Sequence, residues 1–207
     1  MMGSMQCVPD TLPVVRPSMH SGRVHRLPAR GSWFPKLQDW ITQGREQDAL
    51  PWLLPYRRES WAQALLGKIR WKNPNTAHKA FRWFKRAAPW RDDGDPVVLR
   101  LAQCYAHGIG TPVNLFMARR VYLRAANALQ IEALVALGDI EAQGLLIPIN
   151  RVRAGSWYAV AVMLIKDAQY KEAIEDRMVE LIWRLPREDF DRVFDDALQW
   201  WAEHSTE

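Results

Sequence analysis

Cysteine is scarce in this sequence, and its two cysteines, Cys7 and Cys104, lie far apart. Small secreted proteins held by disulfides carry several closely spaced cysteines, so this scarcity favours a reducing compartment. Long apolar runs are missing as well. No stretch of about 18 uninterrupted apolar residues occurs, which predicts that no helix spans a membrane. The first 32 residues lack the apolar run of a secretory signal, so we expect a cytoplasmic protein.

Acidic residues are almost absent from residues 1–32, where Asp10 stands against four arginines. We interpret this segment as a basic, disordered N-terminal tail. An organelle-targeting leader has the same arginine-rich, acid-poor composition, and the opening MMGSM also resembles a remnant of cloning. These alternatives stay open at the level of the sequence.

Charge of either sign is unevenly distributed, although the formal net charge is only +5. Between Tyr56 and Arg91, ten basic residues are opposed by a single acid, Glu59. From Arg187 to the end of the chain the sign reverses, with seven acids and two arginines. One end of the fold is therefore expected to be basic and the other acidic.

The alternating apolar pattern of strands is also missing, and a repeated helical spacing takes its place. Shifting the sequence by 36 residues places Leu101 on Leu137 and Tyr122 on Tyr158. A third copy lies upstream, with a shorter loop of sequence KNPNT between its two helices. A period between 20 and 50 residues is typical of solenoids. Because two short helices cannot bury their apolar faces alone, the copies are expected to stack.

Turn and cap residues divide each copy into two helices. Asp95 followed by Pro96 predicts a helix start, and Asn75 or Thr76, Asn114 and Asn150 stand where the second helices should begin. Gly108 and Gly110 are expected to end the first helix of the second copy with positive φ angles. The small residues Ala118, Ala125 and Ala126 predict close helix packing, with Tyr122 filling the space beside them.

The stretches KAFRWFKRAA, residues 79–88, and LAQCYAHGIGTP, residues 101–112, resemble the second helix and the first helix with its loop in Sel1-like repeats (SLR), which are relatives of the tetratricopeptide repeat. Ala102 replaces the usual glycine. Arg70 and Glu141 stand where Tyr105 does, and Leu146 stands where the third copy should have its second glycine. The resemblance implies an all-α fold, an αα-hairpin repeat solenoid that forms a tetratricopeptide-like right-handed superhelix with capping helices.

The predicted organisation has four parts. Residues 1–32 form the tail, and residues 33–60 a degenerate helical cap. Three repeats follow at about 61–95, 96–131 and 132–167 (together 61–167), and residues 168–207 supply capping helices. In this last part, the helix around Tyr170 to Leu185 is expected to be sandwiched. A stripe of apolar residues is expected to form the buried face of the final helix, namely Phe190, Val193, Phe194, Ala197, Leu198 and Trp201.

Chemical motifs are weak throughout the chain. Gly108-Ile-Gly110 follows a helix and lacks the remaining residues of a phosphate-binding loop. Cys104 and His107 lie one helical turn apart, but a metal needs three or four ligands. Asp92, Asp93 and Asp95 fit a turn and a cap better than a calcium loop. We therefore expect no enzyme activity, no metal and no cofactor.

The resemblance implies an adaptor that binds a protein or peptide, in bacteria often within secretion, envelope or regulatory assemblies. If first helices line the concave side, as the resemblance also implies, helical geometry turns one set of residues toward a partner. This set runs from cationic to slightly anionic: Lys68, Lys72, Arg100, Gln103, His107, Asp139 and Gln143.

The basic, tryptophan-rich first copy supports an alternative function. Aromatic residues among cations can stack bases or contact phosphates, which predicts binding of a polyanion such as nucleic acid or anionic lipid. A solvated helix face, or a surface for an acidic protein, accounts for the same charges. The residues of this predicted basic patch are Arg70, Lys79, Arg82, Lys85 and Arg86. Nothing in the sequence fixes the partner or the oligomeric state.

Overall fold

The computed structural model describes residues 33–73, 75–144 and 149–205. Within these ranges all regular structure is helical, and no strand occurs. The chain divides into two compact units, Met1–Arg57 and Arg58–Glu207, which are described separately. The predicted tail of residues 1–32 and the departure at Leu146 lie outside the described residues.

The first unit contains α1 (Trp33–Thr42), α2 (Glu46–Leu53) and the short 3-10 helix η1 (Leu54–Tyr56). Leu37 and Ile41 of α1 and Ala49 and Leu53 of α2 are buried, so α1 and α2 each have an apolar face. Pro51 lies inside α2. Both helices fall within the predicted cap of residues 33–60, and the capping role itself stays a prediction.

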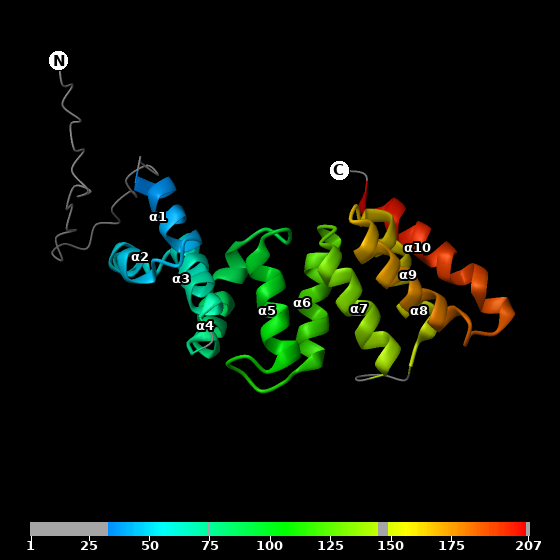
Figure 1. The fold of residues 1–207 in the computed structure, drawn as a ribbon. Helices are drawn as coiled ribbons and strands as arrows, with labels where there is room; N and C mark the ends of the chain where they lie inside the picture. The colour runs from blue at the N-terminus through cyan, green and yellow to red at the C-terminus, as the bar shows by residue number, and fades with distance from the viewer. Residues whose placement is uncertain (1–32, 74, 145–148, 206–207) are drawn as a thin grey trace, which may run out of the picture. The chain divides into compact units, whose positions relative to one another are not determined.

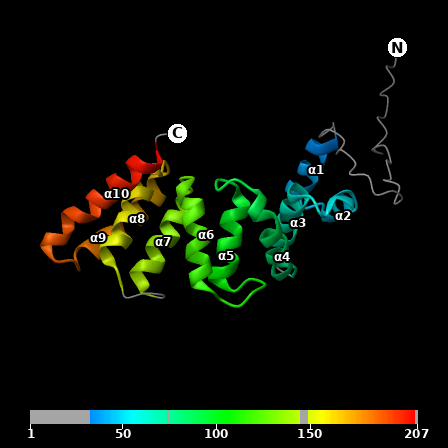
Figure 2. The same cartoon turned by 180° about the vertical axis from the view of Figure 1, so that it is seen from behind.

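The second unit is an array of helices in which each helix packs against the next, up to α9 (Figure 1). Figure 2 shows the same succession from behind. Its helices are α3 (Ser60–Lys72), α4 (Ala77–Ala87), η2 (Ala88–Trp90), α5 (Pro96–His107), α6 (Leu115–Asn127), α7 (Ile131–Gln143), α8 (Arg151–Leu164), α9 (Ala168–Ile182), η3 (Arg187–Asp189) and α10 (Phe190–His204). The pairs α3–α4, α5–α6 and α7–α8 are the three αα-hairpins.

Three of the four predicted helix starts have the predicted cap. The Asp95 side chain accepts a hydrogen bond from the backbone N–H of Val97 at the start of α5. Asn114 and Asn150 cap α6 and α8 in the same way. Thr76 precedes α4 without a side-chain cap bond. Each cap satisfies a backbone donor that the helix itself leaves unpaired.

The paired glycines after α5 have the predicted conformation. Gly108 ends the helix with φ of 71°, and Gly110 has φ of 75°. A Cβ atom on Gly110 would lie 2.0 Å from the carbonyl oxygen of His78. The loop therefore packs directly on the first turn of α4, and only glycine fits there.

Small residues bring the hairpin helices close together, as predicted. Ala118, Ala125 and Ala126 are fully buried, and Tyr122 is 3% exposed. In the third hairpin, the Tyr158 ring lies so close to Gly138 that a Cβ on that glycine would come within 2.4 Å of it. An aromatic ring packed on a glycine backbone replaces an ordinary side-chain contact here.

The C-terminal helices pack differently from the prediction. The sandwiched helix is α8, which packs against α7, α9 and α10 and is buried without a break from Ala154 to Ala161. In α9, only Ile174 is buried, and Trp183 is 79% exposed. The sequence prediction was wrong because apolar residues on several sides of α9 do not all find a packing partner.

The buried face of α10 is also rotated from the predicted stripe. Val193 and Ala197 are buried, as expected, but Phe194 and Leu198 are 47% and 57% exposed. Trp200, which the stripe did not include, packs edge-to-face against Trp157 of α8. Apolar residues cover more than one third of the circumference of α10. The sequence alone therefore does not determine which of them face α8.

Candidate functional site

Three of the predicted partner-binding residues on α3 and α5 are exposed, namely Lys68, Arg100 and His107. The Arg100 guanidinium donates to Oε1 of Gln103 at 2.8 Å. The same guanidinium lies 5.3 Å from the ring centroid of Trp71, which brings α3 and α5 together at this surface. The side chain of Lys72 lies outside the described part of the structure.

The predicted residues on α7, Asp139 and Gln143, line one cavity of about 460 Å³. Its walls come from α7, α8 and α9, and its other lining residues are Ala142, Tyr158, Arg177, Glu180, Leu181 and Arg184. Two arginines and two carboxylates make the lining balanced in charge. This end of the predicted surface is therefore hollowed and polar rather than simply anionic.

Asp139 is held by neighbours that the sequence prediction missed. The Tyr158 hydroxyl donates to Oδ1 of Asp139 at 2.7 Å, and an Arg177 N–H donates to the same oxygen at 3.3 Å. Burial, together with the hydrogen bond and negative charge of Asp139, raises the pKa of Tyr158. Burial, with the nearby Asp139 charge, also raises the pKa of Tyr122 to about 12. The repeated tyrosine spacing contained a signal for Tyr158, whereas no repeat pattern indicated Arg177.

The predicted set is joined only in part. Arg100 and Gln103 are bonded to each other, and Asp139 and Gln143 share the cavity. No hydrogen bond or ion pair among the described residues joins the α5 set to the α7 set. Continuity of the whole surface thus stays a prediction.

Four of the five predicted basic-patch residues share one face of α4. Lys79, Arg82, Lys85 and Arg86 are exposed, opposite the buried Ala80, Phe84 and Ala87. The Arg86 guanidinium lies 5.6 Å from the Trp83 ring centroid, and Lys85 lies 5.7 Å from that of Phe81. None of the four forms an ion pair within the described residues. Arg70 is separate, because it is half-buried on α3.

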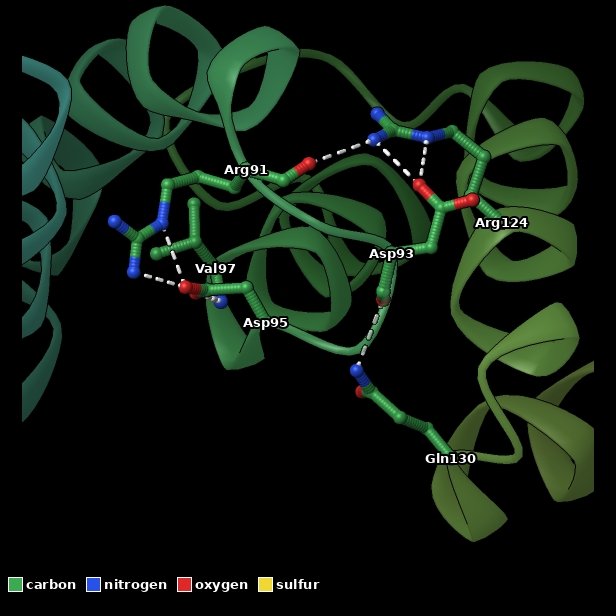
Figure 3. Close-up of polar contacts among 6 residues, drawn as sticks. All are labelled: Arg91, Asp93, Asp95, Val97, Arg124 and Gln130. Atoms are coloured by element: carbon green, nitrogen blue, oxygen red, sulfur yellow. Dashed lines mark hydrogen bonds and ion pairs between the residues drawn. The ribbon is translucent and has the colours of Figure 1, made fainter. Parts of the chain in front are cut away.

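The carboxylates before α5 form structural contacts, as their positions predicted (Figure 3). Asp95 pairs with Arg91 while it caps α5. Asp93 pairs with the Arg124 guanidinium of α6 at 2.7 Å, and its carbonyl accepts from the Gln130 side chain at 3.1 Å. These bonds fix the loop before α5 to both ends of the α6–α7 turn and so hold neighbouring hairpins in register.

Cys104 and His107 do not converge. Cys104 is fully buried, and burial raises the pKa of its thiol to about 12, so the reactive thiolate is suppressed. His107 is exposed in the last turn of α5. Across the described ranges, no three His, Cys, Asp or Glu residues are grouped as metal ligands.

No helix in the described part of the chain has both the length and the apolar character required to cross a bilayer.

No family model matches this sequence, and no curated protein matches it. Solved structures are similar in fold. One is a protective antigen of uropathogenic Escherichia coli strains that displays an SLR fold, with a TM-score of 0.64, 20% identity and coverage of 76% of this chain. The matched region is 33% of the antigen, so this chain spans about one third of its length.

Another similar structure is that of a Sel1 repeat protein from Oxalobacter formigenes. Its TM-score is 0.58 at 18% identity, and the match covers 83% of this chain and 69% of that one. At sequence identities of 20% and 18%, the similarity establishes the fold alone. Together with the three hairpins and their packing, it shows that the chain has the Sel1-like repeat fold, an all-α solenoid of αα-hairpins.

Proposed function

We propose that this protein is a non-catalytic scaffold that binds a partner protein or peptide along the exposed surface of α3, α5 and α7. The observation that carries the proposal is the cavity lined by Asp139 and Gln143. These two residues are the α7 end of the predicted surface, so this surface includes a recess. Helical repeat proteins use extended surfaces of this kind for recognition. A place in a bacterial assembly, secretion or regulatory complex, in the cytoplasm, is part of the same proposal.

The charges along this surface indicate what the partner should offer. Lys68 and Arg100 are cations without a carboxylate partner among the described residues, which favours acidic groups at the α3–α5 end. At the α7 end, Arg177 already compensates Asp139. A polar, uncharged or zwitterionic group fits that cavity better than a lone cation.

Affinity purification from the native host, followed by mass spectrometry, tests the proposal. The double variant Lys68→Glu, Arg100→Glu should lose the captured partner, because both substitutions reverse exposed charges on the proposed surface. Arg120→Glu on α6 is the matched control, since Arg120 is exposed and unpaired within the described residues. Equal capture by both variants would exclude this surface.

The exposed cations of α4 support a second candidate function, polyanion binding. The four cations form no ion pair within the described residues, and two of them, Lys85 and Arg86, lie over the rings of Phe81 and Trp83. Such a face is suited to phosphates and stacked bases. If this is the function, the protein should bind heparin or single-stranded nucleic acid, and affinity should fall steeply with salt. Arg82→Glu with Arg86→Glu should abolish this binding, whereas Lys68→Glu with Arg100→Glu should not.

A further inference from the structure

Two oppositely charged helix faces of the second unit form no ion pair within the described residues. The basic face of α4 consists of Lys79, Arg82, Lys85 and Arg86. The acidic face of α10 consists of Asp191, Asp195, Asp196 and Glu203. We infer that these faces bind each other between two copies of the chain, so that α10 of one copy docks on α4 of another.

The basic face of α4 has the geometry of a docking surface. Its four cations lie within about one third of the helix circumference, directly opposite the buried residues, as the spacing of 100° per residue requires. All four are exposed. Trp90, just beyond α4, is 78% exposed and adds an apolar element beside the charges. Such an arrangement fits a partner helix that carries carboxylates.

The acidic face of α10 is complementary in charge. Its four carboxylates are exposed and form no ion pair within the described residues. Asp191 and Asp195 lie opposite the buried Val193 and Ala197, and Asp196 and Glu203 lie along the edge toward α8. Arg192, on the same side of the helix, is paired with Asp189. Phe194 and Leu198, both about half exposed, border the other edge. Acidic and apolar groups are thus combined on one helix surface.

A groove beside these acids supplies a place for an inserted cation. It encloses about 260 Å³ between α8 and α10 and is lined by Trp157, Trp200, Asp196 and Glu203, among others. Aromatic rings beside carboxylates are the surroundings that an arginine or lysine side chain prefers. Arg153 also lines the groove, but its guanidinium is paired with Glu141 at 2.5 Å.

The two faces cannot meet within one molecule. Figures 1 and 2 place α4 and α10 at opposite ends of the second unit, with α5 to α8 between them. A contact between copies satisfies both faces. It gives a closed pair if each copy contributes both faces, and a chain of copies if the contacts do not close. Because the contact is largely ionic, it should weaken as salt screens the charges.

Sedimentation velocity of the full chain tests this inference. At about 50 mM NaCl the protein should associate in a concentration-dependent manner, and at about 500 mM NaCl it should become monomeric. A basic-to-acidic variant of α4 (Arg82→Glu, Lys85→Glu, Arg86→Glu) should weaken self-association about tenfold or more. An acidic-to-basic variant of α10 (Asp191→Lys, Asp195→Lys, Asp196→Lys) should do the same.

Mixing these two variants gives the decisive result. The acidic α4 of one variant then matches the basic α10 of the other, so the mixture should form heterodimers although neither variant associates alone. The control Glu172→Lys, Asp176→Lys reverses exposed charges on α9 and should associate like the wild type. A wild-type monomer at low salt, or failure of the mixture to associate, would overturn the inference. Circular dichroism checks that each variant is folded.

Discussion

Two successive interfaces of the solenoid solve the same packing problem with different chemistry. Between α4 and α5, the rings of Phe81 and Tyr105 meet edge-to-face with centroids 5.2 Å apart. The equivalent positions one repeat later are Arg119 on α6 and Glu141 on α7, which form an ion pair at 2.9 Å. An aromatic pair in one interface is therefore replaced by a charged pair in the next.

The charged pair between α6 and α7 needs more partners than the aromatic pair between α4 and α5. Glu141 is 0% exposed, and both Arg119 and Arg153 donate to its Oε1 atom. The other oxygen, Oε2, has no hydrogen-bond partner among the described residues. A buried carboxylate requires compensation, whereas a tyrosine ring requires only contact. The comparison shows that the hairpin geometry fixes where these side chains meet, and the side chains decide how sensitive each interface is.

Removing both arginines that bind Glu141 should cause the largest loss of stability. In Arg119→Ala, Arg153→Ala, Glu141 stays buried without a counter-charge, which should lower the free energy of unfolding by about 3–5 kcal/mol. Urea denaturation followed by circular dichroism measures the loss. Adding Glu141→Gln removes the buried charge and should recover part of the stability. A loss below about 1 kcal/mol in the double variant would show that water reaches Glu141.

Alkaline pH should destabilise the hairpin cores rather than the ion pair. Burial raises the pKa of Cys104 and of Tyr122 to about 12, and also raises that of Tyr158. The unfolded chain loses these protons at lower pH than the folded chain. Stability should therefore be constant below about pH 9 and fall toward pH 12, by about 2 kcal/mol at pH 10.

Urea denaturation at successive pH values measures this dependence. Cys104→Ala removes a buried group with an ordinary pKa near 9, so it should reduce the fall between pH 9 and 10. Arg119→Ala, Arg153→Ala should leave the slope unchanged, because neither residue titrates in this range. A wild-type stability that stays constant up to pH 11 would contradict the prediction.

The repeat pattern allowed the hairpins, the caps of α5, α6 and α8 and the glycine turn after α5 to be predicted, because these depend on local spacing and backbone conformation. Helical spacing also predicted that Asp139 and Gln143 share one side of α7, and both line the same cavity, while their role in binding a partner stays a prediction. Their partners Tyr158 and Arg177 come from other helices, and Arg177 follows no repeat. The orientation of α9 and α10 was mispredicted because these helices have apolar residues on several sides, and only tertiary packing selects among them.

Gly138 and Ala102 occupy the same position in successive hairpins, and exchanging them tests how closely each pair of helices packs. In Gly138→Ala, the new Cβ would lie 2.4 Å from the Tyr158 ring, so the ring must shift away from Asp139. We expect a net loss of about 1–2 kcal/mol, since overpacking outweighs the gain in helix propensity. Ala102→Gly should cost about 1 kcal/mol through helix propensity. A stabilising Gly138→Ala would show that the third hairpin opens freely.

Transplanting the aromatic pair into the charged interface should have the smallest effect. In Arg119→Phe, Glu141→Tyr, the buried carboxylate leaves together with Arg119, and Arg153, whose side chain is 40% exposed, can turn to solvent. Stability should therefore stay within about 1 kcal/mol of the wild type. Glu141→Tyr alone leaves Arg119 and Arg153 facing a new phenol, and Arg119→Phe alone leaves Glu141 with one arginine. Each single variant should therefore be less stable than the double. Urea denaturation of the wild type, the two single variants and the double variant completes a double-mutant cycle, at low and at high salt. The coupling free energy between the two positions should be favourable. Additive single effects would mean that the two interfaces are not equivalent, and that the ion pair is specific to the third hairpin.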